Sequence, residues 1–126
     1  MKIADVIGSV DSLKPNQYTG AQKVRWLSEC DSNIWKNIIE THEKVEGMPD
    51  VFYGYDPDKD MESRLLVPAP HDILYRYYLE MQIDFYNKEI NAYNNSAAIY
   101  NRAAAEFAAW YNRTYMPRAY ADHFKY

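Results

Sequence analysis

Cysteine and glycine are both scarce in this chain of 126 residues, and each scarcity excludes a class of protein. The single cysteine, Cys30, cannot form a disulfide within the chain, which is typical of a protein made in a reducing compartment. The four glycines are scattered, so the sequence contains no glycine-rich loop that could cradle a phosphate. No run approaches the roughly 20 apolar residues that span a bilayer, so we expect no association with a membrane.

The chain also lacks a cluster of basic residues. Its net charge is −4, and its lysines and arginines are scattered along the sequence. Proteins that neutralise nucleic-acid phosphates usually carry a basic patch, so we do not expect direct binding of DNA or RNA. An acidic surface would still suit a protein past which DNA slides, because repulsion prevents sticking.

The acidic residues, histidines and cysteine of the chain form no catalytic or metal-binding motif. Residues 56–62 share alternating acids with a calcium loop, but Met61 takes the place of the required glycine and Val67 that of the bidentate glutamate. His42 stands alone on an apolar helix face, whereas zinc needs three or four converging ligands. Cys30 has no histidine base at a suggestive spacing. We therefore predict no catalytic residue, no cofactor and no metal site, and a protein that is not an enzyme.

Tyrosine, in contrast, is abundant, with 13 residues. A tyrosine buries a large ring while keeping a polar tip, so it suits interfaces between proteins. It also fills ordinary core and boundary positions, and composition alone does not place the rings. Both interpretations stay open at this point.

The first third of the chain predicts three short helices, over about residues 3–10, 19–28 and 34–45. Apolar residues recur at helical spacing in the first of them. Thr19 and Gln22 form a capping box that would begin the second. The polar residues 31–33 offer an N-cap for the third, and Gly47 with Pro49 would end it.

Residues 48–67 have a different character. They contain two short apolar runs, the first of which is rich in β-favouring residues, separated by a polar turn at 56–60. This pattern predicts either a small hairpin or an extended excursion from an otherwise helical fold.

From Asp72 to about Tyr115, no glycine or proline interrupts the sequence, and apolar residues repeat every seven positions. Such a heptad repeat is typical of a helix that packs along a partner helix. The residues predicted from it to form an interface or packing seam are Leu79, Ile83, Tyr86, Ile90, Tyr93, Tyr100, Phe107 and Tyr111.

Two arrangements of this segment fit the pattern. One continuous helix would be about 60 Å long, so its apolar stripe would need cover from another subunit. A break near Asn94 and Asn95, which have low helix propensity, would instead give two antiparallel helices that cover each other. The unbroken heptad register favours the continuous helix. In either case we predict a mostly all-α helical bundle, a single domain over residues 1–126 with residues 118–126 as a candidate flexible tail.

Several segments resemble the small head–tail connector proteins, also called adaptor or head-completion proteins, of tailed phages and prophages. Their opening helices are similar to the stretch KVRWLSECDSNIWKNII at residues 23–39. Prophage proteins of Gram-positive bacteria have runs similar to VPAPHDILY at 67–75, YL at 78–79, ID at 83–84, YNN at 93–95 and YNRTYMP at 111–117. The resemblance covers roughly residues 18–117, and residues 48–66 depart from it as an insertion.

The resemblance implies a structural protein of the virion, made in the bacterial host cytoplasm. Its copies would assemble as a ring beneath the portal protein and offer a docking surface to the tail or stopper proteins. DNA would pass through the ring without being read. The alternative is a monomeric helical protein-interaction module, such as a prophage regulator, with a self-covered pair of helices.

Overall fold

The computed structural model describes residues 1–43 and 51–116, and these residues form four α-helices. The helices are α1 (Ile3–Leu13), α2 (Gly20–Ile34), α3 (Leu74–Tyr86) and α4 (Ile90–Thr114). A π-helical turn, Trp35–Ile39, continues α2, and a 3-10 turn, His71–Ile73, leads into α3. No strand occurs in these ranges, so the predicted all-α fold is confirmed.

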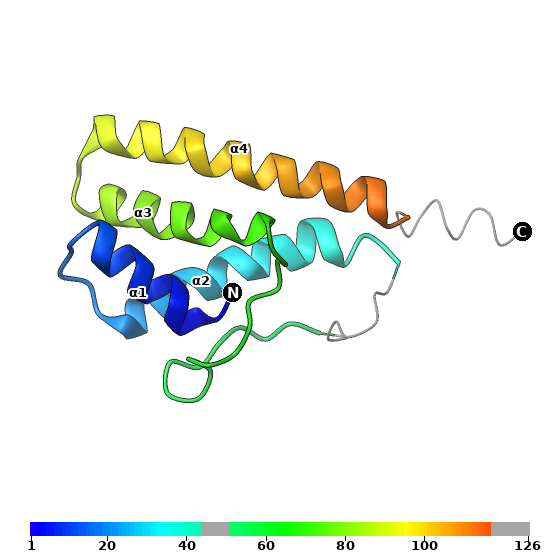
Figure 1. The fold of residues 1–126 in the computed structure, drawn as a ribbon, viewed down its shortest axis with the longest axis horizontal. Helices are drawn as coiled ribbons and strands as arrows, with labels where there is room; N and C mark the ends of the chain where they lie inside the picture. The colour runs from blue at the N-terminus through cyan, green and yellow to red at the C-terminus, as the bar shows by residue number, and fades with distance from the viewer. Residues whose placement is uncertain (44–50, 117–126) are drawn as a thin grey trace, which may run out of the picture.

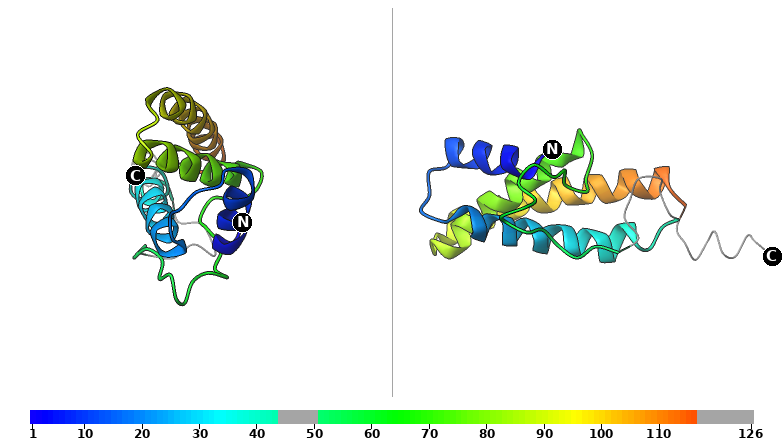
Figure 2. Two further views of the ribbon diagram at one scale, coloured as in Figure 1. Left: turned by 90° about the vertical axis from the view of Figure 1, so that its left-hand side faces the viewer. Right: turned by 90° about the horizontal axis from the view of Figure 1, so that it is seen from below.

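Helix α3 lies at the centre of the bundle. Helix α4 runs antiparallel along one side of it, and α1 and α2 pack against the opposite side (Figure 1). The end-on view shows α3 seated over the space between α1 and α2 (Figure 2). The core side chains that are at most 1% exposed include Ile3, Val6, Val10, Val24, Leu27, Val67, Leu74, Tyr75, Leu79, Ile83, Phe107 and Tyr111.

Helix α1 forms where the apolar spacing predicts it, and its apolar residues face the core. It ends at Leu13, where the backbone N–H of Lys14 donates to the carbonyl of Val10. Pro15 follows at once. A residue that precedes proline is disfavoured in the helical conformation, so the chain leaves the helix at this point.

The capping box that begins α2 is also confirmed. The backbone N–H of Thr19 donates to Gln22 Oε1, and that of Gln22 donates to Thr19 Oγ1, each over 3.2 Å. The predicted end of this helix near Ser28 is wrong, because α2 continues to Ile34. Residues 31–33 were expected to cap a separate helix and lie inside α2 instead. The helix predicted over about 34–45 is also too long, because helical structure ends at Ile39 and His42 lies beyond it. The predicted stop residues Gly47 and Pro49 fall outside the described residues.

Residues 51–67, which we call the strap, form an irregular excursion beneath the helices, with turns at 57–59 and 61–62 and no strand (Figure 1). The strap is tied to the start of the chain: the N–H of Ile3 donates to the carbonyl of Ser63 over 3.1 Å, and that of Leu65 to the carbonyl of Met1 over 3.0 Å. Of the two predicted alternatives, the excursion without a strand hairpin is the correct one for the described part of this segment, although turns bend its path. Residues 48–50 and the candidate tail 118–126 lie outside the described residues.

The continuous helix predicted from residue 72 to residue 115 is wrong. Helix α3 ends at Tyr86 and α4 begins at Ile90, so the alternative of two antiparallel helices is correct. The break does not come at Asn94 and Asn95, which lie inside α4. It comes where Lys88 adopts a φ of +62°, a left-handed conformation that reverses the chain. The heptad pattern runs through this turn because both helices need an apolar stripe.

The turn generates a prediction about stability. A side chain with a Cβ is strained at positive φ, whereas glycine is not, so Lys88→Gly should raise the free energy of unfolding. We expect a gain of about 0.5–1 kcal/mol relative to Lys88→Ala, which removes the same charge but keeps the Cβ. Urea denaturation of the two variants measures this difference. Equal stability of the glycine and alanine variants would contradict the role assigned to this residue.

Candidate functional site at the tip of the helical hairpin

The structure divides the predicted interface residues into two groups. Leu79, Ile83, Phe107 and Tyr111 are buried in the core of the chain itself, and Tyr100 is half-buried against α3. They therefore act in packing within one molecule. Tyr86, Ile90 and Tyr93 instead come together where α3 turns into α4, which we call the hairpin tip.

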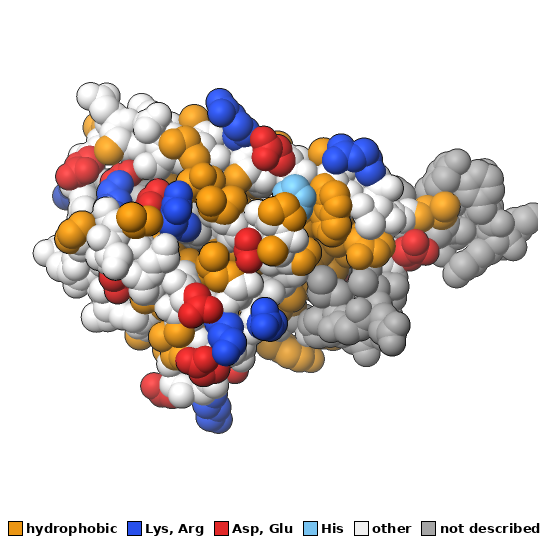
Figure 3. All heavy atoms as spheres, viewed as in Figure 1, with side chains coloured by type: hydrophobic (Ala, Val, Ile, Leu, Met, Phe, Trp, Pro, Cys, Tyr) orange, Lys and Arg blue, Asp and Glu red, His pale blue; other side chains and the backbone are white. Residues whose placement is uncertain are grey.

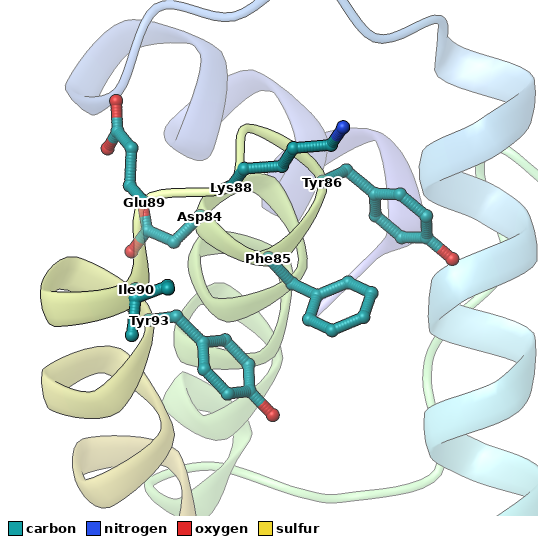
Figure 4. Close-up of a pocket in the computed structure, with 7 residues that line it drawn as sticks. All are labelled: Asp84, Phe85, Tyr86, Lys88, Glu89, Ile90 and Tyr93. Atoms are coloured by element: carbon teal, nitrogen blue, oxygen red, sulfur yellow. The ribbon is translucent and has the colours of Figure 1, made fainter.

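The hairpin tip carries an open, apolar pocket of about 480 Å³. Phe85 and Tyr86 are each 53% exposed there, and Ile90 is 72% exposed. Large apolar side chains that gather on a surface mark sites of interaction more often than scattered ones do. The residues that line the pocket are Asp84, Phe85, Tyr86, Lys88, Glu89, Ile90 and Tyr93 (Figure 4).

The aromatic rings at the tip form a connected row. The Phe85 ring lies between those of Tyr86 and Tyr93, with centroid separations of 5.1 and 5.5 Å (Figure 4). Tyr86 stacks on Trp26 of α2 at 5.4 Å, and Tyr18 meets the same indole edge-on at 5.4 Å. Because Trp26 is only 5% exposed, the core holds one end of the row in place. The site is thus partly preorganised for an apolar partner.

A buried carboxylate fastens the helices around this pocket. Asp84, which is fully buried, forms an ion pair with Lys14 and accepts a hydrogen bond from the hydroxyl of Ser96. These contacts join α3 both to the end of α1 and to α4. Lys88 and Glu89, in contrast, are exposed at the rim. The pocket therefore has an apolar wall, a carboxylate that is ion-paired with Lys14, and exposed charges of both signs at its rim.

A second polar cluster lies deeper and centres on Asp31. The Tyr75 hydroxyl donates to its carboxylate over 2.6 Å, the Leu66 N–H donates over 3.1 Å, and the Tyr55 hydroxyl donates as well. Burial raises the pKa of Asp31 to about 6, against the lowering effect of these hydrogen bonds. Asp31 is inaccessible to solvent, so we interpret the cluster as a joint between α2, the strap and α3.

Cys30 and His42 are both packed inside the molecule. The Cys30 sulfur lies 3.6 Å from the Tyr100 hydroxyl, and burial raises the pKa of the thiol above its usual range. His42 places Nε2 2.6 Å from Asn112 Oδ1 and packs its ring edge-on against Tyr111. Within residues 1–43 and 51–116, no three His, Cys, Asp or Glu side chains gather closely enough to hold a metal ion.

The remaining surface carries charges of both signs. Acidic and basic side chains are interspersed on the face shown in Figure 3, which offers no extended basic surface for phosphates. In the described part of the chain, no helix combines the length and apolar character needed to cross a membrane.

Sequence reasoning missed two residues that matter at these sites. Phe85 lies outside the heptad positions, and its exposure depends on a turn that the heptad pattern conceals. Asp31 was read as part of a helix cap, although its partners Tyr55 and Tyr75 are 24 and 44 residues away in sequence. No local spacing signals such a contact, since it exists only once the strap and α3 are folded against α2.

Comparison with models of protein families, with curated proteins and with solved structures gives no match for this chain. The function of the hairpin tip must therefore be argued from its own chemistry. The resemblance of sequence segments to head–tail connectors stays a basis for proposals alone.

The pKa of Asp31 generates a prediction about pH. Because the folded-state pKa, about 6, lies above the ordinary value of 3.8, the folded state holds this proton more tightly. The resulting stabilisation is fully present below about pH 4 and is lost as the pH rises through about 6, a change of about 3 kcal/mol.

Urea unfolding from pH 3 to pH 8, with Asp31→Asn as the control that does not titrate, measures this effect. The stability of the wild type minus that of the variant should fall by about 3 kcal/mol over this range. A difference that does not change with pH would contradict the burial of a titrating Asp31.

Proposed function

We propose that this protein is a non-enzymatic structural subunit that docks onto other protein chains through the hairpin tip. The observation that carries the proposal is that the large side chains of Phe85, Tyr86 and Ile90 are exposed around an apolar pocket. Aromatic residues that combine a rigid ring with partial exposure are typical anchors of protein interfaces. A soluble chain that left them uncovered would carry an aggregation liability, which an assembly partner removes.

The partners we propose are those of a phage head–tail connector: further copies of this chain, the portal protein, and the tail or stopper proteins. Three features support this choice. The sequence segments described above resemble connector proteins, the fold is a small helical bundle, and the chain is acidic, with a net charge of −4. An acidic ring would let DNA pass through its lumen without sticking. Such a protein would reside in the virion after synthesis in the host cytoplasm.

A monomeric interaction module is the second candidate function, and one observation favours it. Helices α3 and α4 cover each other, so the heptad stripe does not need a second subunit as a continuous helix would. In this case the hairpin tip would bind a single host protein, as a prophage regulator does.

The mass of the protein in solution distinguishes the two candidates. We expect light scattering across a concentration series to show assemblies larger than the monomer, or uptake of the chain onto added portal rings. A strict monomer that ignores the portal at every concentration would reject the connector and leave the monomeric module. Cofractionation of an unrelated acidic helical protein with the portal serves as the control for nonspecific adsorption.

A further inference from the structure

The pocket at the hairpin tip has the chemistry to take aromatic side chains from an extended segment. Its wall is formed by the rings of Phe85, Tyr86 and Tyr93 and by the exposed side chain of Ile90. Aromatic rings pack favourably against each other in offset or edge-to-face arrangements, with a gain beyond the area they bury. A segment with several rings and few charges of its own would suit this surface.

This chain itself contains such a segment. Residues 117–126 include the rings of Tyr120, Phe124 and Tyr126. Arg118 and Lys125 outweigh the single Asp122, so the segment is basic with a net charge of +1, whereas the whole chain carries −4. The segment is thus complementary in charge to the molecule that bears the pocket.

The segment cannot place Tyr120 or Phe124 in the pocket of its own molecule. It follows Met116, two residues beyond the end of α4 at Thr114, whereas the pocket is lined by residues at the start of that helix. Figure 1 shows the two ends of α4 far apart. The path along α4 from Tyr93 to Thr114 is about 32 Å. An extended chain carries Phe124 at most about 28 Å beyond Met116, and Tyr120 about half as far. The pocket of another molecule is the one within reach.

We propose that residues 117–126 of one copy occupy the hairpin-tip pocket of the next copy, with Tyr120 and Phe124 packed against Phe85 and Ile90. The pocket and the segment lie at opposite ends of the molecule, so the contact is head-to-tail. A repeated head-to-tail contact closes into a ring when the rotation permits and otherwise grows as a filament. The inference deepens the proposed function, on which it rests, by naming the contact that joins the subunits.

Two variants of the whole chain test the two sides of this contact, the pocket and the segment, independently. Ile90→Asp places a charge in the pocket and leaves the segment intact. The double substitution Tyr120→Ser with Phe124→Ser removes two rings from the segment and leaves the pocket intact. Ile90 is 72% exposed, so its substitution should not disturb the core. Tyr53→Asp, at a site that is 91% exposed and outside the pocket, is the matched control.

Sedimentation velocity of these proteins, alone and mixed, tests the proposal. We expect the wild type and Tyr53→Asp to self-associate, and each contact variant to stay monomeric. An equimolar mixture of the two contact variants should form a dimer that grows no further, since it holds one intact pocket and one intact segment. Association of either contact variant to the same extent as the wild type, or a mixture that stays monomeric, would overturn the proposal.

A peptide measures the same contact without assembly. A fluorescein-labelled peptide of residues 117–126 should bind the double-serine variant saturably in fluorescence anisotropy. Addition of Ile90→Asp to that receptor should weaken binding at least tenfold, while Tyr53→Asp should leave it unchanged. Absence of saturable binding, or equal binding to both receptors, counts against the inference. If the protein is nevertheless taken up by portal rings in that case, the proposed connector function stands and only the subunit contact is wrong.

Discussion

The fold depends on one buried carboxylate, that of Asp31. It lies in the last turn of α2 and accepts hydrogen bonds from Tyr55 and Leu66 of the strap and from Tyr75 of α3. A charge buried without partners would cost several kcal/mol, so these three donors must all be in place for Asp31 to remain inside. The donors belong to two elements, the strap and α3, and the acceptor belongs to a third, α2. Asp31 therefore requires α2, the strap and α3 to fold together, rather than as independent pieces.

A second buried carboxylate, that of Asp84, joins helices in the same way at the other end of α3. Its contacts with Lys14 and Ser96 hold the end of α1 and the first turns of α4 around the hairpin tip. Together the two carboxylates fix α3 at both of its ends. The aromatic row at the tip is positioned by this arrangement, because Tyr86 extends from α3 and stacks on Trp26 of α2. Buried polar contacts thus fix the helices from which the exposed side chains of the hairpin tip extend.

This architecture separates the two ends of an elongated molecule. Residues at the start of α4 line the pocket of the hairpin tip, and the helix ends at Thr114. Figure 1 shows these two ends of α4 far apart. Surfaces at opposite ends suit a repeating, head-to-tail assembly, whereas a single self-complementary patch would give a closed pair. The proposed role as a connector subunit and the proposed contact through residues 117–126 are both consistent with this separation.

The sequence by itself determined the helical class of the fold, the position of α1 and the capping box of Thr19 and Gln22, because these depend on neighbours within a few residues. It also placed Tyr86, Ile90 and Tyr93 among the candidate contact residues. Only the tertiary structure decided that α3 and α4 separate at Lys88, since a left-handed turn at a lysine follows from the packing of both helices. It alone also placed Asp31 in the core, because a carboxylate is buried only where distant donors converge on it. The exposure of Phe85 has the same origin, in the place where the chain reverses.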